Sequence, residues 1–400
     1  MAHHRSRLVA VGAIAVLALS ACGTSDGGGE GGGSAAPPTM QALDTIGEGE
    51  GEVNILAWAG YAEDGSTDPA VDWVTPFEQK TGCQANVQVA DTSDSMFEKM
   101  GTGDFDVVSA SGDSSLRMIY AGKVAPVNTD LFTSYADVPD FQKMQAWNSV
   151  DGVAYGMPHG WGAQLMAYRS DVVTPAPTSW DVVFGADSPY SGKITDYDSP
   201  TDGIAAAAVY LMATQPDLGI ENPYALDQDQ FDAAVELLKS QQPHVGSYWA
   251  SYTDAQKALE NGSTVVGSTW QIIVNLAQAD AAPVESVLPD EGATGWADTW
   301  MVDAKSPHPS CAYEWINWVT SPEVQAQVAE WFGEAPANTQ ACALTTEPTH
   351  CDTFHADDQA YFDKIWFWTT PQSACLDGRT DVKCVPYAEW GKAWSEVKNG

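Results

Sequence analysis

From about residue 53 onward, short apolar runs alternate with longer stretches in which apolar residues recur every three or four positions. The first run, EVNILAWAGY, predicts a strand that begins near Val53, and the next stretch, PAVDWVTPFEQKTGC, predicts a helix. In that helix Trp73 and Phe77 lie four residues apart, and Gly82 is placed to end it. QANVQVA, DSMFEKMGTG and FDVVSAS continue as strand, helix and strand. This order predicts a parallel, doubly wound α/β sheet.

Ligands bind such a sheet at the carboxyl ends of its strands, which makes three loops candidates: residues 58–61, 91–95 and 109–113. The middle of the chain repeats the alternation, with strands in KITDYDSPTDG and STVVGSTW and helices in IAAAAVYLMAT, DQFDAAVELLKSQ and TDAQKALENGS. SCAYEWINWVTS and SPEVQAQVAEWFG predict two more helices, whose buried faces would hold Trp315, Trp318 and Trp331. Roughly 350 residues are too many for one core, so we expect two lobes.

The stretch GWADTW, residues 295–300, places two tryptophans around an aspartate. In a strand, alternate residues face the same way, so Trp296, Asp298 and Trp300 would share a face. Aromatic rings and a carboxylate on one face suit an organic cation. The alternative is a buried strand packed with large rings, with Asp298 as a turn or cap residue.

The N-terminus reads as an export signal. Arg5 and Arg7 precede a short apolar run that is too short to cross a membrane, so residues 1–21 are expected to be a signal peptide. LSAC, which ends at Cys22, resembles the lipobox of bacterial lipoproteins, in which the cysteine carries the lipid; an ordinary cleaved signal is the alternative. The Gly-rich residues 22–52 would be a flexible tether. We therefore expect an exported protein, lipid-anchored to the outer face of the bacterial cytoplasmic membrane.

The chain is strongly acidic, with 17 basic and 54 acidic side chains and a formal net charge of −37. Removing the signal peptide removes two arginines and no acid. This balance argues against nucleic acid as a partner, because phosphate binding needs a basic face. It also creates a field that attracts cations, although acidity can serve solubility alone.

Apart from Cys22 the chain has six cysteines, and an even number in an exported protein suggests disulfides. Fifteen pairings are possible. The two local ones would join Cys342 to Cys351 and Cys375 to Cys384, which leaves a long-range bridge between the remaining two, Cys83 and Cys311. Zinc is the alternative, with His350 and His355 near Cys351, but the CxxC pairs of a structural zinc site are absent. We expect neither a metal nor a cofactor.

The order of these elements resembles the extracellular solute-binding proteins of ABC importers, and among them the spermidine/putrescine-binding group. Five segments carry the resemblance, in the order ILAWAGYAEDG, PFEQKTGCQANV, GDFDVVSAS, AYGMPHGWGAQLMAYRSD and SPEVQAQVAEWFGEAPAN. It covers roughly residues 53–340. The C-terminal tail, with four cysteines, is longer than is usual in this family.

This resemblance implies a type II two-lobed clamp of α/β lobes, with ligand bound in the cleft between them and closure by hinge motion. Lobe one would comprise residues 53–157 and 298–342, and lobe two residues 158–297 and 343–400, with hinges near Pro158 and Trp296. Cys83 and Cys311 would then both lie in lobe one. The implied partners are the permease and ATPase subunits of the importer and a small cationic ligand, and we expect a monomer.

The family's ligand residues match this sequence position by position. Trp58 and Tyr61 match the aromatic pair after the first strand, and Trp270 matches the aromatic residue after STVVG. Trp296 and Asp298 match a WxD on the returning crossover. The serine-bearing loop supplies Ser109 and Ser111, with Gly112 or Asp113 where an aromatic residue is expected. Asp198 matches the first acid of lobe two, and a second acid would fall at Thr201 or Asp202.

Several alternatives have less support. An enzyme would be expected to show GxSxG, HExxH, a P-loop or GxGxxG, and none occurs in a suitable context. Asp196 and Asp198 could be the carboxylate pair of a glycosidase, but nothing else supports a secreted hydrolase. Among ligands, a polyamine is expected first. A quaternary ammonium compound or an amino acid comes second, because the uncertain second acid and the SASGD loop could shorten the site. Asp113 could instead cap the helix that follows it.

Overall fold

The computed structural model describes residues 36–90 and 92–400 of the chain. The expected signal peptide, the lipidation site Cys22 and the first part of the tether lie outside these residues. Within the described ranges, no helix combines the length and the apolar character that crossing a membrane requires.

The larger sheet has seven strands, and its first part is parallel. β1 (Glu52–Ala57) pairs in parallel with β2 (Gln84–Val89) and β3 (Val107–Ser111), as the alternation predicted. The sheet continues antiparallel through β12 (Ala293–Val302), β6 (Met157–Ala163) and β13 (Ala335–Pro336), and β14 (Ile365–Phe367) adds to β12. Its helices are α1 (Val74–Thr81), α2 (Ser93–Lys99), α3 (Gly112–Tyr120), α9 (Pro309–Val319) and α10 (Pro322–Phe332).

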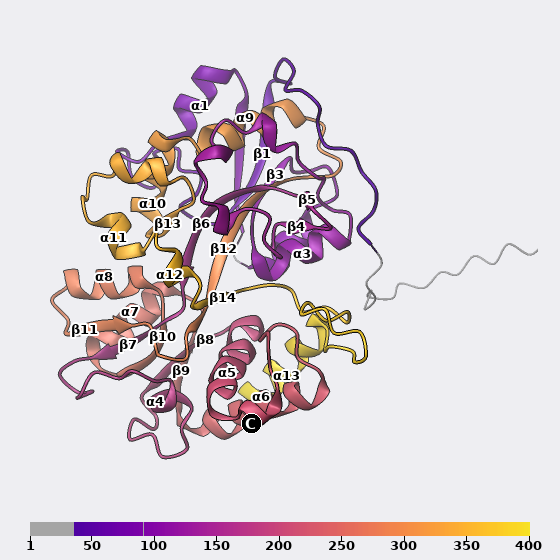
Figure 1. The fold of residues 1–400 in the computed structure, drawn as a ribbon. Helices are drawn as coiled ribbons and strands as arrows, with labels where there is room; N and C mark the ends of the chain where they lie inside the picture. The colour runs from indigo at the N-terminus through magenta and orange to yellow at the C-terminus, as the bar shows by residue number, and fades with distance from the viewer. Residues whose placement is uncertain (1–35, 91) are drawn as a thin grey trace, which may run out of the picture. The chain divides into compact units, whose positions relative to one another are not determined.

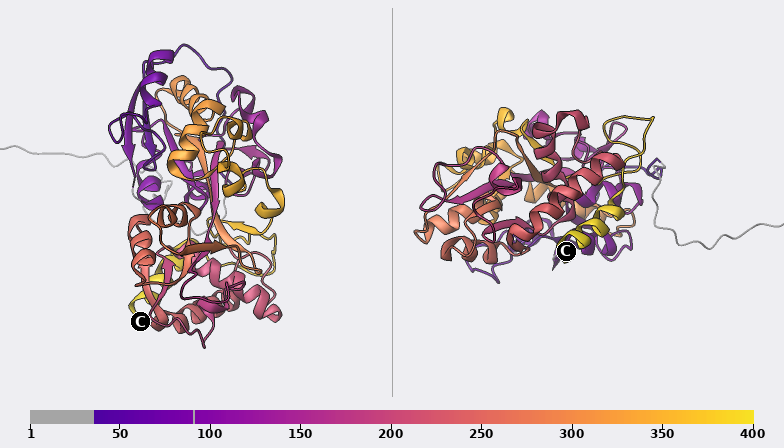
Figure 2. Two further views of the ribbon diagram at one scale, coloured as in Figure 1. Left: turned by 90° about the vertical axis from the view of Figure 1, so that its left-hand side faces the viewer. Right: turned by 90° about the horizontal axis from the view of Figure 1, so that it is seen from below.

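The smaller sheet has five strands in the order β11–β7–β10–β8–β9, with bounds Val284–Val287, Leu165–Arg169, Val266–Thr269, Ile194–Tyr197 and Val245–Trp249. Its helices are α4 (Asp181–Phe184), α5 (Pro200–Thr214), α6 (Gln228–Gln241), α7 (Tyr252–Asn261) and α8 (Gln271–Ala279). The last helix, α13 (Tyr387–Asn399), packs on α5 and α6 (Figure 1, Figure 2). The short helices α11 (His350–Phe354) and α12 (Gln359–Phe362) and the hairpin of β4 (Ser149–Val150) and β5 (Val153–Ala154) complete the fold.

The chain passes between the sheets at three places. It leaves the larger sheet after Ala163 and enters the smaller at Leu165, and it returns between Val287 and Ala293. The third passage is the C-terminal tail, which joins β14 to α13 (Figure 1). These positions show only which strands belong to which sheet. The division into lobes at residues 157/158 and 297/298 remains a prediction.

Local sequence signals explain several helix ends. Ser199 caps α5 with Pro200 in its first turn, and Asp227 and Gln230 form a capping box on α6. Gly82 ends α1 in the left-handed region at φ 76°, as predicted. One expectation fails in α10: Trp331 is 39% exposed and does not belong to the core, although Trp315 is fully buried.

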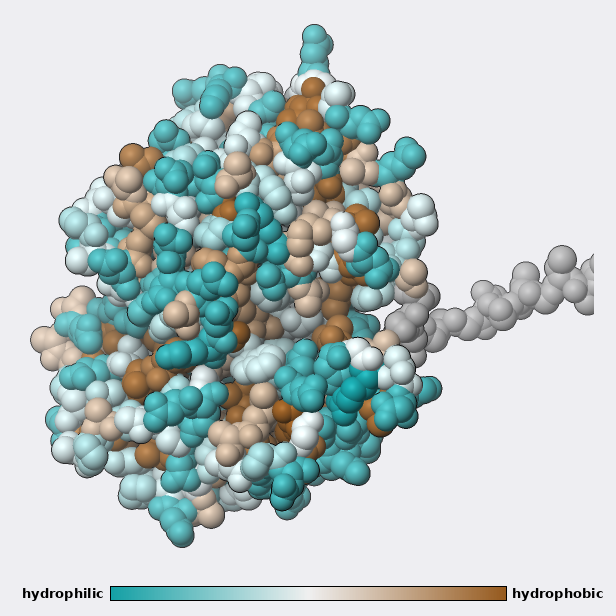
Figure 3. Space-filling model, in the orientation of Figure 1, coloured by the Kyte–Doolittle hydropathy of each residue, from teal (hydrophilic) through white to brown (hydrophobic). Residues whose placement is uncertain are grey.

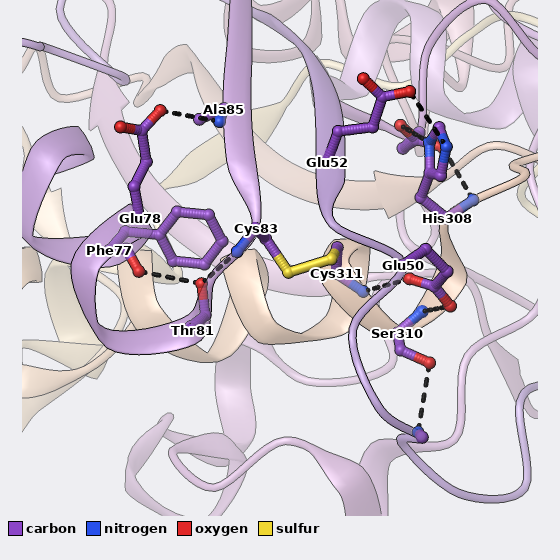
Figure 4. Close-up of a disulfide and its surroundings, with 12 residues drawn as sticks. Glu50, Glu52, Phe77, Glu78, Thr81, Cys83, Ala85, His308, Ser310 and Cys311 are labelled. Atoms are coloured by element: carbon purple, nitrogen blue, oxygen red, sulfur yellow. Dashed lines mark hydrogen bonds and ion pairs between the residues drawn. A yellow bond between two sulfur atoms is a disulfide. The ribbon is translucent and has the colours of Figure 1, made fainter.

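The structure contains three disulfides, Cys83–Cys311, Cys342–Cys351 and Cys375–Cys384, which confirms the expected pairing. Figure 4 shows the first of them, which joins the residue before β2 to the first turn of α9. Beside it, both carboxylate oxygens of Glu50 accept backbone N–H groups at the start of α9, from Ser310 at 3.0 Å and Cys311 at 2.9 Å. The bridge therefore ties the N-terminal edge of the larger sheet to a helix more than two hundred residues later.

Removing this disulfide is expected to destabilise the protein more than removing a local one. Its cysteines are 228 residues apart, against 9 for Cys342–Cys351. The loop-entropy relation gives about 5 kcal/mol for the long loop and about 3 kcal/mol for the short one. We expect Cys83→Ala/Cys311→Ala to lower the free energy of unfolding more than Cys342→Ala/Cys351→Ala in urea denaturation. Equal losses would contradict this ordering.

Candidate ligand-binding cleft

Strand β12 carries the GWADTW stretch through the middle of the larger sheet, between β6 and β3. The ring of Tyr61 lies 6.3 Å from Trp300 and 4.5 Å from Phe332, and Phe332 lies 5.7 Å from Trp296. These rings join the two tryptophans along one side of the strand, as the alternation predicts. Trp300 is fully buried beside Trp315, so it is a core residue and not part of a ligand wall.

Asp298, between the two tryptophans, is held by hydroxyl groups. Ser111 Oγ donates to its Oδ1 at 2.5 Å, and the Tyr61 hydroxyl lies 2.8 Å from its Oδ2. The same hydroxyl lies 2.8 Å from Oε2 of Glu334, which follows α10. Asp298 is only 3% exposed, and burial raises its pKa to about 7 against the opposing effect of the two hydroxyl donors.

The Tyr61 hydroxyl carries one proton, so it can donate to only one of these two carboxyl groups. Burial, and then the charge of Asp298, raises the pKa of Glu334 well above its usual value, so Glu334 is the group that keeps its own proton. Glu334 then donates to Tyr61, and Tyr61 donates to Asp298. His159, 3.4 Å from Glu334, is also neutral, because burial lowers its pKa to about 3. Because Glu334 donates to Tyr61 and Tyr61 donates to Asp298, Asp298 is the carboxyl group of the three residues that can carry the negative charge.

The smaller sheet contributes two further buried carboxyl groups. Asp202, in the first turn of α5, accepts from Thr294 Oγ1 at 2.5 Å and from the Trp368 indole at 3.1 Å, both on its Oδ1. Asp196, on β8, accepts from Ser268 Oγ at 2.9 Å and from the backbone N–H of Tyr197. The second oxygen of each group is buried and has no hydrogen bond of normal geometry among the described residues. The side-chain amides of Gln164 and Gln241 nevertheless lie close enough to lower the pKa of Asp202 and of Asp196, respectively. Burial raises the pKa of Asp202 to about 6 and that of Asp196 to about 7.

A row of aromatic rings connects the two sets of acids. Tyr197 stacks on Trp368 with ring centres 5.7 Å apart and planes inclined by 7°, and on its other side lies 5.3 Å from Trp270. Trp270 lies 6.5 Å from Trp296. Trp296 in turn contacts Phe332, and Phe332 contacts Tyr61. Asp202 therefore lies at the Trp368 end of the row and Asp298 at the Tyr61 end.

The electrostatics of Tyr197 show that acids from both sheets gather here. Burial raises the pKa of its hydroxyl, and so do the charges of four carboxylates: Asp113, Asp202, Asp198 and Asp298. Asp113 lies in the first turn of α3 and accepts from Ser93 at 2.8 Å, so it is not the cap of that helix. Burial raises its pKa to about 6. We call Asp113, Asp196, Asp202, Asp298 and Glu334 the carboxylate cluster.

Three members of this cluster have no protein cation as an ion-pair partner. In the described part of the chain, Asp196, Asp202 and Asp298 form no ion pair with a lysine, arginine or histidine. Arg117 is within electrostatic reach of Asp113, but its ion pair is with Asp94 at 2.5 Å. An ionised carboxylate buried without a partner is costly. A cation entering among these groups would remove that cost, so the arrangement suits a positively charged ligand.

A pocket opens beside the aromatic row. Its lining includes Trp270 and Trp296 of the row and Phe354, His355 and Tyr361 of the C-terminal tail. Figure 3 shows a largely hydrophilic face, with apolar residues visible in the recess between the elements of the two sheets. The tail therefore forms part of the boundary of the cleft region, although it lies beyond residues 53–340, the part of the chain that resembles the family.

The ten residues matched as ligand contacts do not all lie in one group. Six of them join through the contacts above: Tyr61, Ser111, Asp202, Trp270, Trp296 and Asp298. Asp113 contacts Ser93 and reaches the group only through the effect of its charge on Tyr197. Ser109 accepts the backbone N–H of Trp58 at 3.1 Å, and the indole N–H of Trp58 is buried with no hydrogen-bond partner among residues 36–90 and 92–400. Asp198 is engaged elsewhere, because its Oδ1 accepts from Trp394 at 2.9 Å and from Lys398 at 2.5 Å, both on α13.

Three residues of the region were not anticipated as site residues, namely Tyr197, Glu334 and Trp368, and Asp196 was considered only as one of a glycosidase's two carboxylates. Tyr197 and Asp196 lie in the stretch KITDYDSP, where a strand ending in acids and an aromatic ring could have indicated them. Glu334 follows a glycine in the left-handed region, which gives no signal that its side chain turns inward. Trp368 lies 166 residues from its partner Asp202, so no local pattern connects the two.

Comparison with known proteins agrees with this architecture. Residues 72–353 match the family described as bacterial extracellular solute-binding protein. The chain is 26% identical over 322 residues to the spermidine/putrescine-binding periplasmic protein of Escherichia coli, covering 77% of this chain and 88% of that one. It is 26% identical over 298 residues to the putrescine/agmatine-binding protein of Pseudomonas aeruginosa, covering 68% and 78%.

Among solved structures, the spermidine/putrescine ABC transporter substrate-binding protein of Streptococcus pneumoniae superimposes with a TM-score of 0.66 at 19% identity, covering 86% of this chain and 97% of that one. This likeness confirms the type II two-lobed α/β fold. The family consists of binding proteins rather than enzymes, so the glycosidase alternative is not supported. The chain thus belongs to the bacterial extracellular solute-binding proteins and is a substrate-binding component of an ABC importer.

Proposed function

We propose that the protein captures a small polyamine, such as putrescine or spermidine, between its two lobes. The observation that carries this proposal is the carboxylate cluster, whose members from both sheets lie around an aromatic row. In the described residues, its members Asp196, Asp202 and Asp298 form no ion pair with a protein cation. Asp298 would hold one ammonium group and Asp202 the other. Trp270 and Trp296 would face the alkyl chain or a cationic head.

These contacts supply enough free energy for a scavenging receptor. A desolvated cation–π contact contributes roughly 2 kcal/mol, and each hydrogen bond to a charged group contributes about 1.5–3 kcal/mol. Two of each reach micromolar affinity or better after the cost of ordering the ligand. A ligand that contacts acids of both lobes binds the closed clamp more tightly than the open one, and so stabilises it.

Relatives support the same ligand class, since the two compared above are described by the amines they bind. In this proposal the division into lobes follows residues 53–157 with 298–342 and residues 158–297 with 343–400. The monomeric protein would be held at the outer face of the cytoplasmic membrane through a lipid on Cys22. It would deliver the amine to the importer's membrane subunits.

Titration calorimetry of the mature protein tests the proposal. The panel is putrescine, spermidine, a betaine, an amino acid and a sugar, each titrated into the native protein and into Trp296→Ala. We expect micromolar or tighter binding of a polyamine, and about a 30-fold loss in Trp296→Ala, because roughly 2 kcal/mol of ring contact is removed. Trp331→Ala is the matched control, since that ring is 39% exposed on α10.

The same panel tests the second candidate ligand class, a quaternary ammonium compound or an amino acid. The observation that favours it is the engagement of Asp198 by Lys398, which leaves fewer acids for a multiply charged ligand. Binding of the betaine or the amino acid in place of the polyamines would keep the clamp and the aromatic row and overturn the polyamine proposal.

A further inference from the structure

Trp368 lies inside the cleft region on a backbone that is fixed on several sides. Its N–H donates to the carbonyl of Gly295 at 2.8 Å. A Cβ added to Gly112 would clash with the carbonyl oxygen of Trp368, so the tail passes directly against the start of α3. Two residues later, Thr370 Oγ1 donates to the carbonyl of Asp113 at 2.8 Å. The tail is thus attached to β12 and to α3, both of which belong with the larger sheet.

Disulfides and ring contacts limit how far this segment can move. Cys342–Cys351 closes a loop before it and Cys375–Cys384 closes one after it. Further on, the Arg117 guanidinium of α3 lies 4.4 Å over the ring of Tyr387 at the start of α13. A segment restrained at both ends is a wall of the cleft and not a loop that a ligand pushes aside.

The Trp368 side chain occupies the place where the aromatic row meets Asp202. It is 5% exposed, stacks on Tyr197, and gives its indole N–H to Oδ1 of Asp202. Since Thr294 also donates to Oδ1, that oxygen is fully used, whereas Oδ2 is buried and has no hydrogen bond of normal geometry in the described residues. Trp368 therefore orients Asp202 so that one oxygen remains for a ligand, and it closes the row at that end.

Asp298 at one end of the row and Asp202 at the other offer positions for two ammonium groups. Asp196 and Asp113 belong to the same cluster, so the number of acids does not by itself limit the ligand to two ammonium groups. The limit comes from Trp368, which stacks on Tyr197, donates to Asp202 and so closes the row at that end. Asp198 is already engaged by Lys398 and Trp394.

We propose that Trp368 determines specificity by ending the site at Asp202, so that the protein selects a short diamine with two primary ammonium groups over a triamine. This inference rests on the proposed polyamine function and narrows it. Trp368 acts both as the end wall of the site and as a positioning residue for the carboxylate of Asp202.

The experiment is calorimetric titration of putrescine and spermidine, reported as the ratio of their dissociation constants. We expect the native protein to prefer putrescine by about tenfold or more, and Trp368→Ala to shift the ratio toward spermidine by about tenfold, because the end of the row opens. Trp368→Phe keeps a ring but removes the N–H, so it should preserve the preference while weakening both amines by about fivefold. If Trp368 had only a structural role, Trp368→Ala and Trp368→Phe would not differ in their effect on the ratio of dissociation constants.

Gly112→Ala provides an independent route to the same change, because its Cβ would displace the carbonyl of Trp368 without altering the indole. It should shift the ratio in the same direction as Trp368→Ala. The matched controls are Trp366→Ala, in β14 two residues before Trp368, and Gly391→Ala on α13, where an added Cβ meets nothing within 4 Å. Both controls should leave the ratio within about twofold of the native value.

Each outcome decides the inference. A native protein that binds putrescine but shows an unchanged ratio in folded Trp368→Ala and Gly112→Ala overturns the role of Trp368 and leaves the polyamine function standing. A native protein that prefers spermidine also overturns it, and one that binds neither amine overturns both proposals. If Trp368→Ala does not fold, the ratio in Gly112→Ala and the affinities in Trp368→Phe decide instead.

Discussion

An Asp298→Asn variant is expected to lose about 100-fold in affinity for putrescine, because it removes the charge from the ammonium position while keeping the shape of the side chain. The neighbouring hydroxyls of Ser111 and Tyr61 can reorient, since an amide offers both an acceptor and a donor. The loss should therefore appear in binding rather than in folding. Calorimetry at pH 8 measures the affinity, and thermal unfolding of the ligand-free variant checks the fold.

Asp303→Asn is the matched control for this substitution. Asp303 follows β12 directly, is 2% exposed and has a pKa that burial raises, but its carboxylate accepts backbone N–H groups of Gly101 and Lys305 far from the aromatic row. It should change affinity by less than about threefold. If both variants lose affinity equally, Asp298 acts through general stability or charge, and its assignment as the ammonium partner is wrong.

Much of the fold could be read from the sequence because its signals are local. Each βα unit of the larger sheet is indicated by a short apolar run followed by an amphipathic stretch, as in the segment from Val53 to Ser111. The two nine-residue cysteine spacings allow local bridges, which leaves one long-range partner for Cys83. The exposure of Trp331 could not be predicted from such local signals, because whether a helix face is covered depends on elements distant in the chain.

The candidate site could be predicted only in part from the sequence, because some of its contacts join residues that are distant in the chain. Trp296 and Asp298 follow from strand alternation and from resemblance, and the structure brings them beside Tyr61 and Trp270. The tail has no such signal. Its Trp368 reaches Asp202 and its Lys398 engages Asp198 through contacts that span 166 and 200 residues, and these contacts change which acids remain for a ligand.

The affinity for amines is expected to fall about 30- to 100-fold between pH 8 and pH 5.5. Burial raises the pKa of Asp298 to about 7 and that of Asp202 to about 6. A carboxyl group attracts an ammonium ion only above its pKa, whereas alkyl amines keep their charge throughout this range, with pKa values near 10 for a lysine-like group. Below pH 7, binding must therefore displace a proton from Asp298. Calorimetry at constant ionic strength measures this dependence, which should be flatter in Asp298→Asn.

The stability of the ligand-free protein should depend on pH in the opposite direction. A carboxyl group whose pKa is raised by folding holds its proton more tightly in the folded state than in the unfolded chain. Its contribution to stability is complete below the unfolded pKa, near 4, and is lost as pH rises through about 6 to 7 at Asp202 and Asp298. Putrescine should consequently raise the melting temperature more at pH 8 than at pH 5.5, because it replaces the protons that have left. A shift of equal size at both pH values would mean that these carboxylates do not hold the ligand's charge.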